Sequence, residues 1–224
     1  GACKTLALHN HSEKTHPMKL LLINPNTTQA MTDAIAEAAR AVASPGTEIV
    51  AVQPTFGPVS IESHYDEAFA AAGVAEQVRL AAAWRPDAVV IACFGDPGLE
   101  AAREATDAPV LGIAEAAFHA AGMLATGFSV VTTMTRTCIM AERLLQRYGA
   151  DQHCRGVHGT DIPVLDLEGC GVESLQQIED AARDARHMNA DYGLIAFDAI
   201  ASHCPDLSGA RLQPPARPGG FATA

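Results

Sequence analysis

The sequence predicts an α/β fold of two pseudo-symmetric lobes, each with a parallel sheet flanked by helices, and an active site in the crevice between the lobes. Two observations support this prediction. Short β-rich runs alternate along the 224 residues with longer helical patterns, which is the order of parallel sheets covered by helices. In addition, Leu20–Ala43 and Phe128–Tyr148 share the order strand, threonine pair, helix, which suggests a duplication.

The predicted strands are apolar runs without clean polar alternation, as is typical of strands that are covered on both faces. We expect strands at Lys19–Asn24, Glu48–Gln53, Ala88–Cys93, Val110–Ile113, Phe128–Thr132 and Gly193–Phe197. The helices expected between them are Thr28–Ala43, Ile61–Trp84, Pro97–Ala105, Glu115–Leu124, Thr137–Tyr148 and Val172–Met188.

The first lobe is expected to span residues 18–113 and the second residues 114–204. Residues 1–17 hold three histidines and no continuous apolar segment, so they do not resemble a secretory signal. Leu212–Gly220 is too rich in proline and glycine for a regular helix or a central strand. We therefore expect residues 1–17 and 205–224 to be disordered or atypical termini.

Composition favours small-molecule chemistry over binding to nucleic acid or membranes. The chain is 48% hydrophobic and 18% charged, its formal net charge is −11, and its Lys and Arg residues form no basic stripe. No apolar stretch is long enough for a membrane helix. Six cysteines lie scattered without the spacing of a zinc site or a disulfide framework, so we expect reduced thiols in a cytoplasmic protein.

The sequence lacks the common motifs that indicate a bound cofactor or a catalytic metal. It contains no P-loop, no His-Glu-x-x-His and no Gly-x-Ser-x-Gly, so we expect neither a metal nor a cofactor. The expected partner is a small-molecule substrate. A homo-oligomer is also expected, because alanine-rich helices such as Ala68–Ala83 can pack closely between subunits.

Amide and hydroxyl side chains gather in the turns that follow predicted strands. Asn24, Asn26 and Thr27 either cap the next helix or bind a carbonyl, carboxylate or imide oxygen. Thr132 and Thr133 occupy the corresponding turn of the second half, with the same two interpretations. Because parallel strands end at one edge of a sheet, we expect these turns to line the crevice.

Cys93 is the main candidate for chemistry. It ends an apolar strand before a sharp turn into a helix, where positive potential lowers the pKa of a thiol and favours the reactive thiolate. A buried, inert cysteine is the alternative. Phe94 and Gly95 join the candidate binding site, Gly95 because it permits close approach to the backbone. Ser60 is a candidate for binding and for the N-cap of the longest helix.

Together these motifs resemble hydantoin racemases and the related allantoin racemases of the Asp/Glu/hydantoin racemase superfamily. The motifs are, in order, Ile23–Thr28, Gly57–Glu62, Ala92–Leu99, Gly112–Glu115 and the pair Thr132-Thr133. The resemblance spans roughly Met18 to Leu167, and its cysteine segment is specific. It implies a racemase that uses neither metal nor pyridoxal, with one catalytic cysteine from each lobe.

A pair of thiols suits racemisation, because one thiolate can remove a proton from one face of a carbon while the opposite thiol returns a proton to the other face. In a hydantoin this carbon, C5, lies next to a carbonyl, so the intermediate is an enolate whose oxygen needs hydrogen-bond donors. We therefore expect a cofactor-independent isomerase, a racemase of 5-substituted hydantoins or a related cyclic ureide.

The second cysteine departs from the family pattern. Cys93 lies 66 positions after Thr27, and the residue 66 positions after Thr132 is Asp198. The pKa of Asp198 would have to be raised for it to act as a proton donor. The run from Asp198 to Cys204 resembles the approach to the second thiol of the family, so we take Cys93 and Cys204 as the catalytic pair. The alternatives are a single-cysteine decarboxylase or cis–trans isomerase of the same superfamily, or an impaired relative that only binds a ligand.

Overall fold

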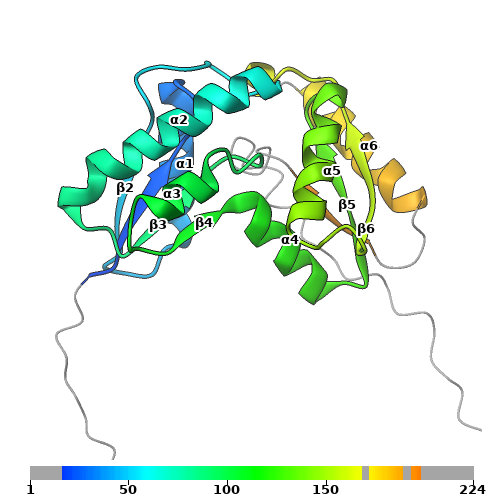
Figure 1. Ribbon diagram of the computed structural model, residues 1–224. Helices are drawn as coiled ribbons and strands as arrows, with labels where there is room; N and C mark the ends of the chain where they lie inside the picture. The colour runs from blue at the N-terminus through cyan, green and yellow to red at the C-terminus, as the bar shows by residue number, and fades with distance from the viewer. Residues whose placement is uncertain (1–16, 168–171, 189–192, 198–224) are drawn as a thin grey trace, which may run out of the picture.

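The computed structural model describes residues 17–167, 172–188 and 193–197. Two lobes lie side by side, each built on a parallel sheet with helices packed against it (Figure 1). The predicted α/β class is confirmed. The described strands up to residue 112 belong to one sheet and those from residue 127 onward to the other. The bounds of the lobes, residues 18–113 and 114–204, stay a prediction.

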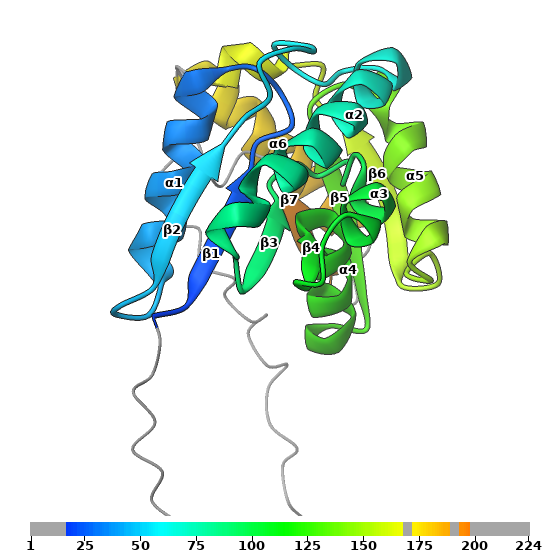
Figure 2. The ribbon, with the colours of Figure 1, turned by 60° about the vertical axis from the view of Figure 1, so that its left-hand side comes forward.

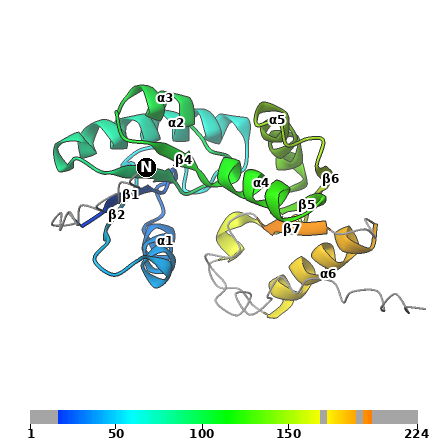
Figure 3. The same cartoon turned by 90° about the horizontal axis from the view of Figure 1, so that it is seen from below.

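The first lobe contains four parallel strands in the order β2-β1-β3-β4 (Figure 2). Helix α1 lies on one face of this sheet, and α2 and α3 lie on the other (Figure 3). The elements are β1 (Lys19–Ile23), α1 (Gln29–Val42), β2 (Glu48–Val52), α2 (His64–Ala81) with a 3-10 turn at Ala82–Trp84, β3 (Ala88–Ile91), α3 (Leu99–Glu104) and β4 (Val110–Gly112).

Alternate residues of the central strands form the core of this lobe, because side chains two apart on a strand share a face. Leu21, Ile23, Val89 and Ile91 are completely buried and pack in one cluster with residues of α2 and α3. In the sheet register, Ile23 pairs with Ile91. The turns that follow β1 and β3 therefore leave the sheet at the same edge.

The second lobe contains three parallel strands in the order β6-β5-β7, with α6 on one side of the sheet and α4 and α5 on the other (Figure 3). Its central strand, β5, is buried along its whole length. The elements are α4 (Ile113–Leu124), β5 (Gly127–Thr132), α5 (Cys138–Arg147), β6 (Cys154–Gly159), α6 (Val172–Met188) and β7 (Gly193–Phe197), with 3-10 turns at Thr135–Thr137 and Val164–Leu167.

Most predicted elements are present with bounds shifted by one to three residues, but strand β6 was not predicted. Its sequence, Cys-Arg-Gly-Val-His-Gly, lacks the apolar run of the other strands. Strand β6 forms by pairing with β5, and the register of this pairing shifts between Phe128 and Ser129 of β5. Within the described ranges, no helix combines the length and the apolar character needed to cross a membrane. The two termini lie outside these ranges.

Candidate active site

The turn between β1 and α1 is ordered by two buried asparagines. Asn24 and Asn26 are 2% and 6% exposed. The side-chain amide of Asn24 donates to Oδ1 of Asn26 at 2.8 Å and to Oγ1 of Thr32 at 3.0 Å. Oδ1 of Asn26 also accepts the backbone amide of Thr28 at 2.9 Å. Both asparagines therefore shape the turn, and their contact with substrate stays a prediction.

This turn is joined to the segment that precedes α2. Thr27 donates twice to the carbonyl of Pro58, through its backbone amide at 2.9 Å and through its hydroxyl at 3.2 Å. The hydroxyl of Thr28 donates to the carbonyl of Val59 at 2.6 Å. Although Thr28 is the N-cap of α1, its side chain makes no cap hydrogen bond. Two motifs distant in sequence thus form one surface at the carboxyl end of β1.

The prediction that Ser60 caps the longest helix is wrong, because α2 begins later. Ser63 is the N-cap, and its side chain accepts a hydrogen bond from the backbone amide of Asp66. Ser60 is half-buried and its hydroxyl lies 3.3 Å from Oε1 of Glu62. Its bond to Glu62, and its place two residues after Pro58, which binds Thr27, keep it among the candidate binding residues.

Cys93 follows β3 after one intervening residue and begins a tight turn. Its carbonyl accepts the backbone amide of Asp96 at 3.0 Å. The Cys93 side chain is half-buried. A Cβ on Gly95 would lie 3.9 Å from Sγ, so a side chain at this position would lie against the thiol. The turn therefore holds the thiol at the end of a central strand, as the sequence predicted.

The side chain of Phe94 belongs to the hydrophobic core of the second lobe. It is 7% exposed and meets Phe118 of α4 edge-on, with ring centroids 5.2 Å apart. Phe118 in turn stacks on Phe128 of β5 at 5.7 Å. A residue of the first lobe thus completes the hydrophobic cluster of the second. Such packing gives Phe94 a structural role, and its contact with substrate stays a prediction.

Asp96 is 2% exposed and carries three hydrogen bonds. The backbone amides of Ala114 and Glu115 donate to its carboxyl group at 3.0 and 2.8 Å, and the hydroxyl of Tyr148 donates at 2.9 Å. Burial raises the pKa of the Asp96 carboxyl above its ordinary value of 3.8, an effect larger than the opposing one of the three bonds. Burial, and then the charge of Asp96, raise the pKa of Tyr148 well above its usual range.

Thr132 and Thr133 lie at the carboxyl end of β5, and each is 3% exposed. The hydroxyl of Thr160 lies within hydrogen-bond distance of both their carbonyls, at 3.4 and 3.1 Å. The next residue but one, Thr135, donates its amide and its hydroxyl to Asp161 at 2.8 and 2.9 Å. These two bonds lower the pKa of Asp161. The loop after β6 therefore supports the hydroxyl-rich turn that was predicted to bind substrate.

The two lobes are connected across the carboxyl ends of their strands by Glu62. Its Oε2 accepts from Arg136 at 2.7 Å, and its Oε1 accepts the amide of Val164 at 3.0 Å. The Glu62 side chain is 16% exposed and that of Arg136 is 58% exposed. Because Glu62 precedes α2 and both partners belong to the second lobe, this contact brings the Ser60 segment next to the Thr132 turn.

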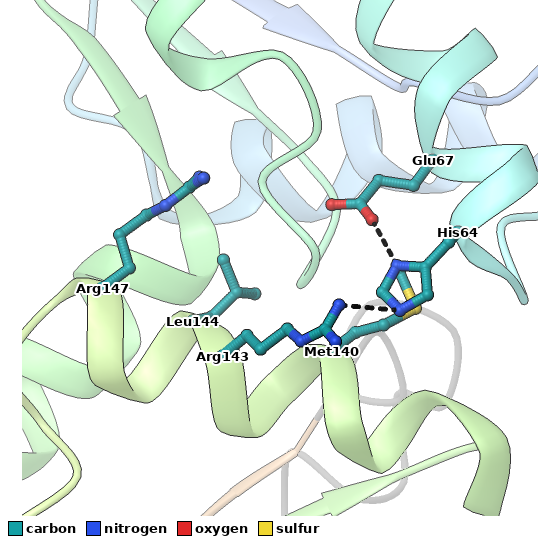
Figure 4. Close-up of a pocket in the computed structure, with 6 residues that line it drawn as sticks. All are labelled: His64, Glu67, Met140, Arg143, Leu144 and Arg147. Atoms are coloured by element: carbon teal, nitrogen blue, oxygen red, sulfur yellow. Dashed lines mark hydrogen bonds and ion pairs between the residues drawn. The ribbon is translucent and has the colours of Figure 1, made fainter.

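A pocket of about 240 Å³ lies beside this contact, between α2 and α5 (Figure 4). His64 lies between Glu67, 3.1 Å from Nδ1, and Arg143, 3.4 Å from Nε2. The pocket is lined by His64, Glu67, Met140, Arg143, Leu144 and Arg147. None of the predicted site residues lines it, and its polar side chains are largely exposed, so we place the candidate site at the strand ends.

The structure brings most predicted residues to the junction of the lobes. The turn that holds Asn24, Asn26 and Thr27 is bonded to Pro58 and Val59, which directly precede Ser60 in the chain, and Cys93 and the Thr132 turn are each held to the opposite lobe through their neighbours. Cys204 and its alternative Asp198 lie outside the described residues. Among the described residues, no group of three or more His, Cys, Asp or Glu could hold a metal ion.

Sequence reasoning missed the contacts that join the lobes. Asp96 and Glu62 lie within motifs that it singled out, but neither received a role. One signal could have indicated Asp96. Gly112, at the start of the fourth helix, has no side chain to accept the first amides of that helix, so a carboxylate in a neighbouring turn, such as Asp96, is the available cap.

Comparison with known proteins identifies the family and agrees with the fold. The family model for Asp/Glu/Hydantoin racemase matches residues 20–195. A hydantoin racemase from Pseudomonas sp. (strain NS671) is 45% identical over 193 residues, which cover 85% of this chain and 77% of that protein. The structure of allantoin racemase from Klebsiella pneumoniae matches with a TM-score of 0.80 at 48% identity, covering 86% of this chain and 79% of that one.

A second structure, allantoin racemase from Pseudomonas fluorescens, matches with a TM-score of 0.72 at 32% identity, covering 92% of this chain and all of that one. The family model covers well over half of the sequence, and the identities extend over most of it. The chain belongs to the Asp/Glu/hydantoin racemase family, which confirms the resemblance found in its motifs.

Proposed function

We propose that this protein racemises 5-substituted hydantoins or a related cyclic ureide, without a cofactor, by moving a proton at the carbon next to a carbonyl. The family model and the similarity to hydantoin and allantoin racemases support a racemase, which is an isomerase. The substrate and the mechanism are our inference from the site.

The position of Cys93 carries this proposal. The thiol is half-buried at the end of β3, on a turn whose next residue is packed into the second lobe. A base at this junction is able to reach a ligand held by both lobes. As a thiolate, Cys93 would take the C5 proton and become a thiol, and the electron pair of the C–H bond would move into the enolate.

Return of a proton to the opposite face needs a second acid, which we propose to be Cys204, with Asp198 as the alternative. Both follow β7 in the sequence. Phe197, the last residue of β7, pairs with Val131, so β7 ends next to β5 and its Thr132 turn. When the second group gives up its proton to C5 it is left ionised, and the pair is ready for the reverse reaction.

The enolate oxygen would be stabilised by donors in the polar turns. The candidates are the hydroxyls of Thr27 and Ser60 on one lobe, which would turn from Pro58 and Glu62 to the substrate, and the Thr132 turn on the other, which the bonds of Thr160 hold in place. Preorganised donors of this kind stabilise a developing negative charge without the cost of reorienting solvent. A flat cyclic imide with oxygens at its edge suits such turns better than a cationic ligand does.

The proposal is tested by incubating each enantiomer of a 5-substituted hydantoin in deuterated water. Proton NMR follows loss of the C5 proton, and polarimetry follows inversion, both after subtraction of the uncatalysed exchange. We expect exchange with inversion from both enantiomers, lost in Cys93→Ala and retained in Cys154→Ser, a matched half-buried cysteine on β6.

Two results would contradict the proposal. Exchange that is independent of Cys93 would remove the assigned base, and exchange without inversion would leave only one working base. Among active variants, loss of inversion in Cys204→Ala with retention in Asp198→Asn would assign the second group to Cys204. The reverse pattern would assign it to Asp198.

A further inference from the structure

Helix α4 begins without a cap of its own. Its N-cap is Gly112, whose extended backbone (φ −92°, ψ 138°) is usual for this position but which has no side chain to accept the first amides. The carboxyl group of Asp96 takes that role, accepting from the amides of Ala114 and Glu115. These are the second and third helical residues, whose amides an N-cap side chain ordinarily binds.

Asp96 and Gly112 are sterically complementary. A Cβ added to Gly112 would overlap the carboxyl carbon and both carboxyl oxygens of Asp96. The cap can therefore come from Asp96 or from a side chain at position 112, but not from both. Here the turn that contains Cys93 supplies the cap to the helix that leads into the second lobe.

A third donor ties the same carboxyl group to the far end of α5. The hydroxyl of Tyr148, the residue that follows α5, donates to Oδ2, which also accepts from Glu115. A carboxylate is able to accept all three bonds, because each oxygen has two lone pairs. An asparagine in its place would turn an NH₂ group toward at least one of these donors. The Cys93 turn is thus fastened to two helices of the second lobe.

The backbone of Asp96 is itself held in an uncommon conformation. Its φ of +43° lies in the left-handed region, and the next residue is Pro97, which further restricts it. Such conformations persist where surrounding contacts impose them. The Asp96 amide also donates to the carbonyl of Cys93. The bonds of the Asp96 side chain therefore maintain the turn that carries the thiol.

We propose that Asp96 is a positioning residue, which fixes the Cys93 turn against the start of α4 and the end of α5. This inference rests on the proposed function, because it connects Asp96 to catalysis only through Cys93. Proton transfer requires the reacting atoms to be within about 3–3.5 Å of each other, and a displacement of about 1 Å can cost about 100-fold in rate. A thiol from one lobe needs such a connection to keep its distance from a group on the other.

The test separates capping of α4 from positioning of the turn. Asp96→Ala removes both. The double variant Asp96→Ala/Gly112→Ser restores a local cap, because the removed carboxyl group leaves space for the serine side chain, but it does not restore the connection. Tyr148→Phe removes one bond. Val78→Ala, which opens space in the core of the first lobe near the end of α2, is a control for lost stability alone.

Three quantities are measured on each variant: Tm, the hydantoin racemisation parameters kcat and KM, and the rate of Cys93 alkylation, quantified by mass spectrometry of its peptide. For Asp96→Ala we expect a fall of about 2–4 °C in Tm and a fall of about 100-fold in kcat with little change in KM. Cys93 alkylation should become several-fold faster as the turn loosens. Tyr148→Phe should change in the same directions by a smaller factor.

The decisive comparison is the double variant. We expect its Tm to recover while kcat stays low and alkylation stays fast, and Val78→Ala to lose Tm with kcat and alkylation unchanged. Recovery of all three quantities would mean that Asp96 only caps α4, and would overturn the inference. If wild-type protein does not racemise any hydantoin, the proposed function fails, whereas the alkylation and Tm data still decide whether Asp96 positions Cys93.

Discussion

Glu62 provides the sharpest test of how the lobes are held together, because its two oxygens have different partners. Oε2 faces the guanidinium of Arg136, and Oε1 accepts the amide of Val164. Glu62→Gln keeps an oxygen for the amide and turns an NH₂ group toward Arg136, which removes the ion pair. Glu62→Ala removes both contacts. The two substitutions therefore separate the ion pair from the backbone bond.

The exposure of the two side chains sets the magnitudes. Since Arg136 is 58% exposed, the ion pair should contribute only about 0.2–1 kcal/mol to the free energy of unfolding. Leaving the Val164 amide without its charged acceptor should cost a further ~1–3 kcal/mol. Glu62→Gln should thus cost about 0.2–1 kcal/mol and Glu62→Ala, which loses both contributions, about 1–4 kcal/mol.

These two contributions to the free energy of unfolding are measured by urea unfolding of the wild type, Glu62→Gln, Glu62→Ala, Arg136→Ala and the double variant Glu62→Gln/Arg136→Ala. The cycle that uses glutamine should give a coupling of about 0.2–1 kcal/mol that shrinks as salt is added. Equal losses in Glu62→Gln and Glu62→Ala would refute the separation of the two contacts. A coupling that did not respond to salt would refute the assignment to an exposed ion pair.

Three further predictions concern the Cys93 turn. Gly112→Ala should displace the Asp96 carboxyl group and cost about 1–3 kcal/mol of stability in urea unfolding, and a neutral effect would show that the turn can move away without loss. Phe94→Ala should cost ~3–5 kcal/mol and Phe94→Leu clearly less; a loss below about 1 kcal/mol for Phe94→Ala would contradict its place in the core. Because the pKa of Asp96 is raised in the folded protein, its carboxyl group keeps a proton above pH 3.8, where the unfolded chain releases it. The stability that Asp96 contributes should therefore fall as the pH rises through the folded pKa. The difference in unfolding free energy between wild type and Asp96→Asn should therefore decrease as the pH rises above 3.8, whereas that of Asp161→Asn should not decrease, because the Asp161 pKa is lowered; an increase for Asp96 would reverse the sign of its shift.

The sequence was sufficient to predict the α/β class because the apolar runs of β1, β3 and β5 carry their own signal. Each is a buried strand between a turn and a helix, and periodicity identifies such segments without tertiary information. Strand β6 lacked this signal. Gly156 and Gly159 weaken its strand propensity, and only pairing with β5 defines it.

The candidate site was predicted in its residues but not in its connections. Cys93 and the threonine turns are recognisable because they follow strands directly. The partners of Asp96 lie 18, 19 and 52 residues away, and those of Glu62 lie 74 and 102 residues away. Contacts at such separations depend on how the two lobes pack, which no local pattern in one sequence specifies.

The contacts along α5, which join the two lobes, differ in how strongly salt should weaken them. Arg136 precedes this helix, Arg143 lies in its middle and Tyr148 follows it, and the three bind Glu62, His64 and Asp96 of the first lobe, respectively. The first contact is an ion pair with an exposed cation and is screened by salt, and the second is a hydrogen bond between exposed side chains.

Asp96, in contrast, is buried, and its bonds include two backbone amides, which salt screens little. The contact near Tyr148 should therefore depend least on salt, whereas the Glu62 contact combines an exposed ion pair with a bond to the backbone amide of Val164. Since Cys93 is fastened to the end of α5 near Tyr148 through Asp96, its position should depend little on ionic strength.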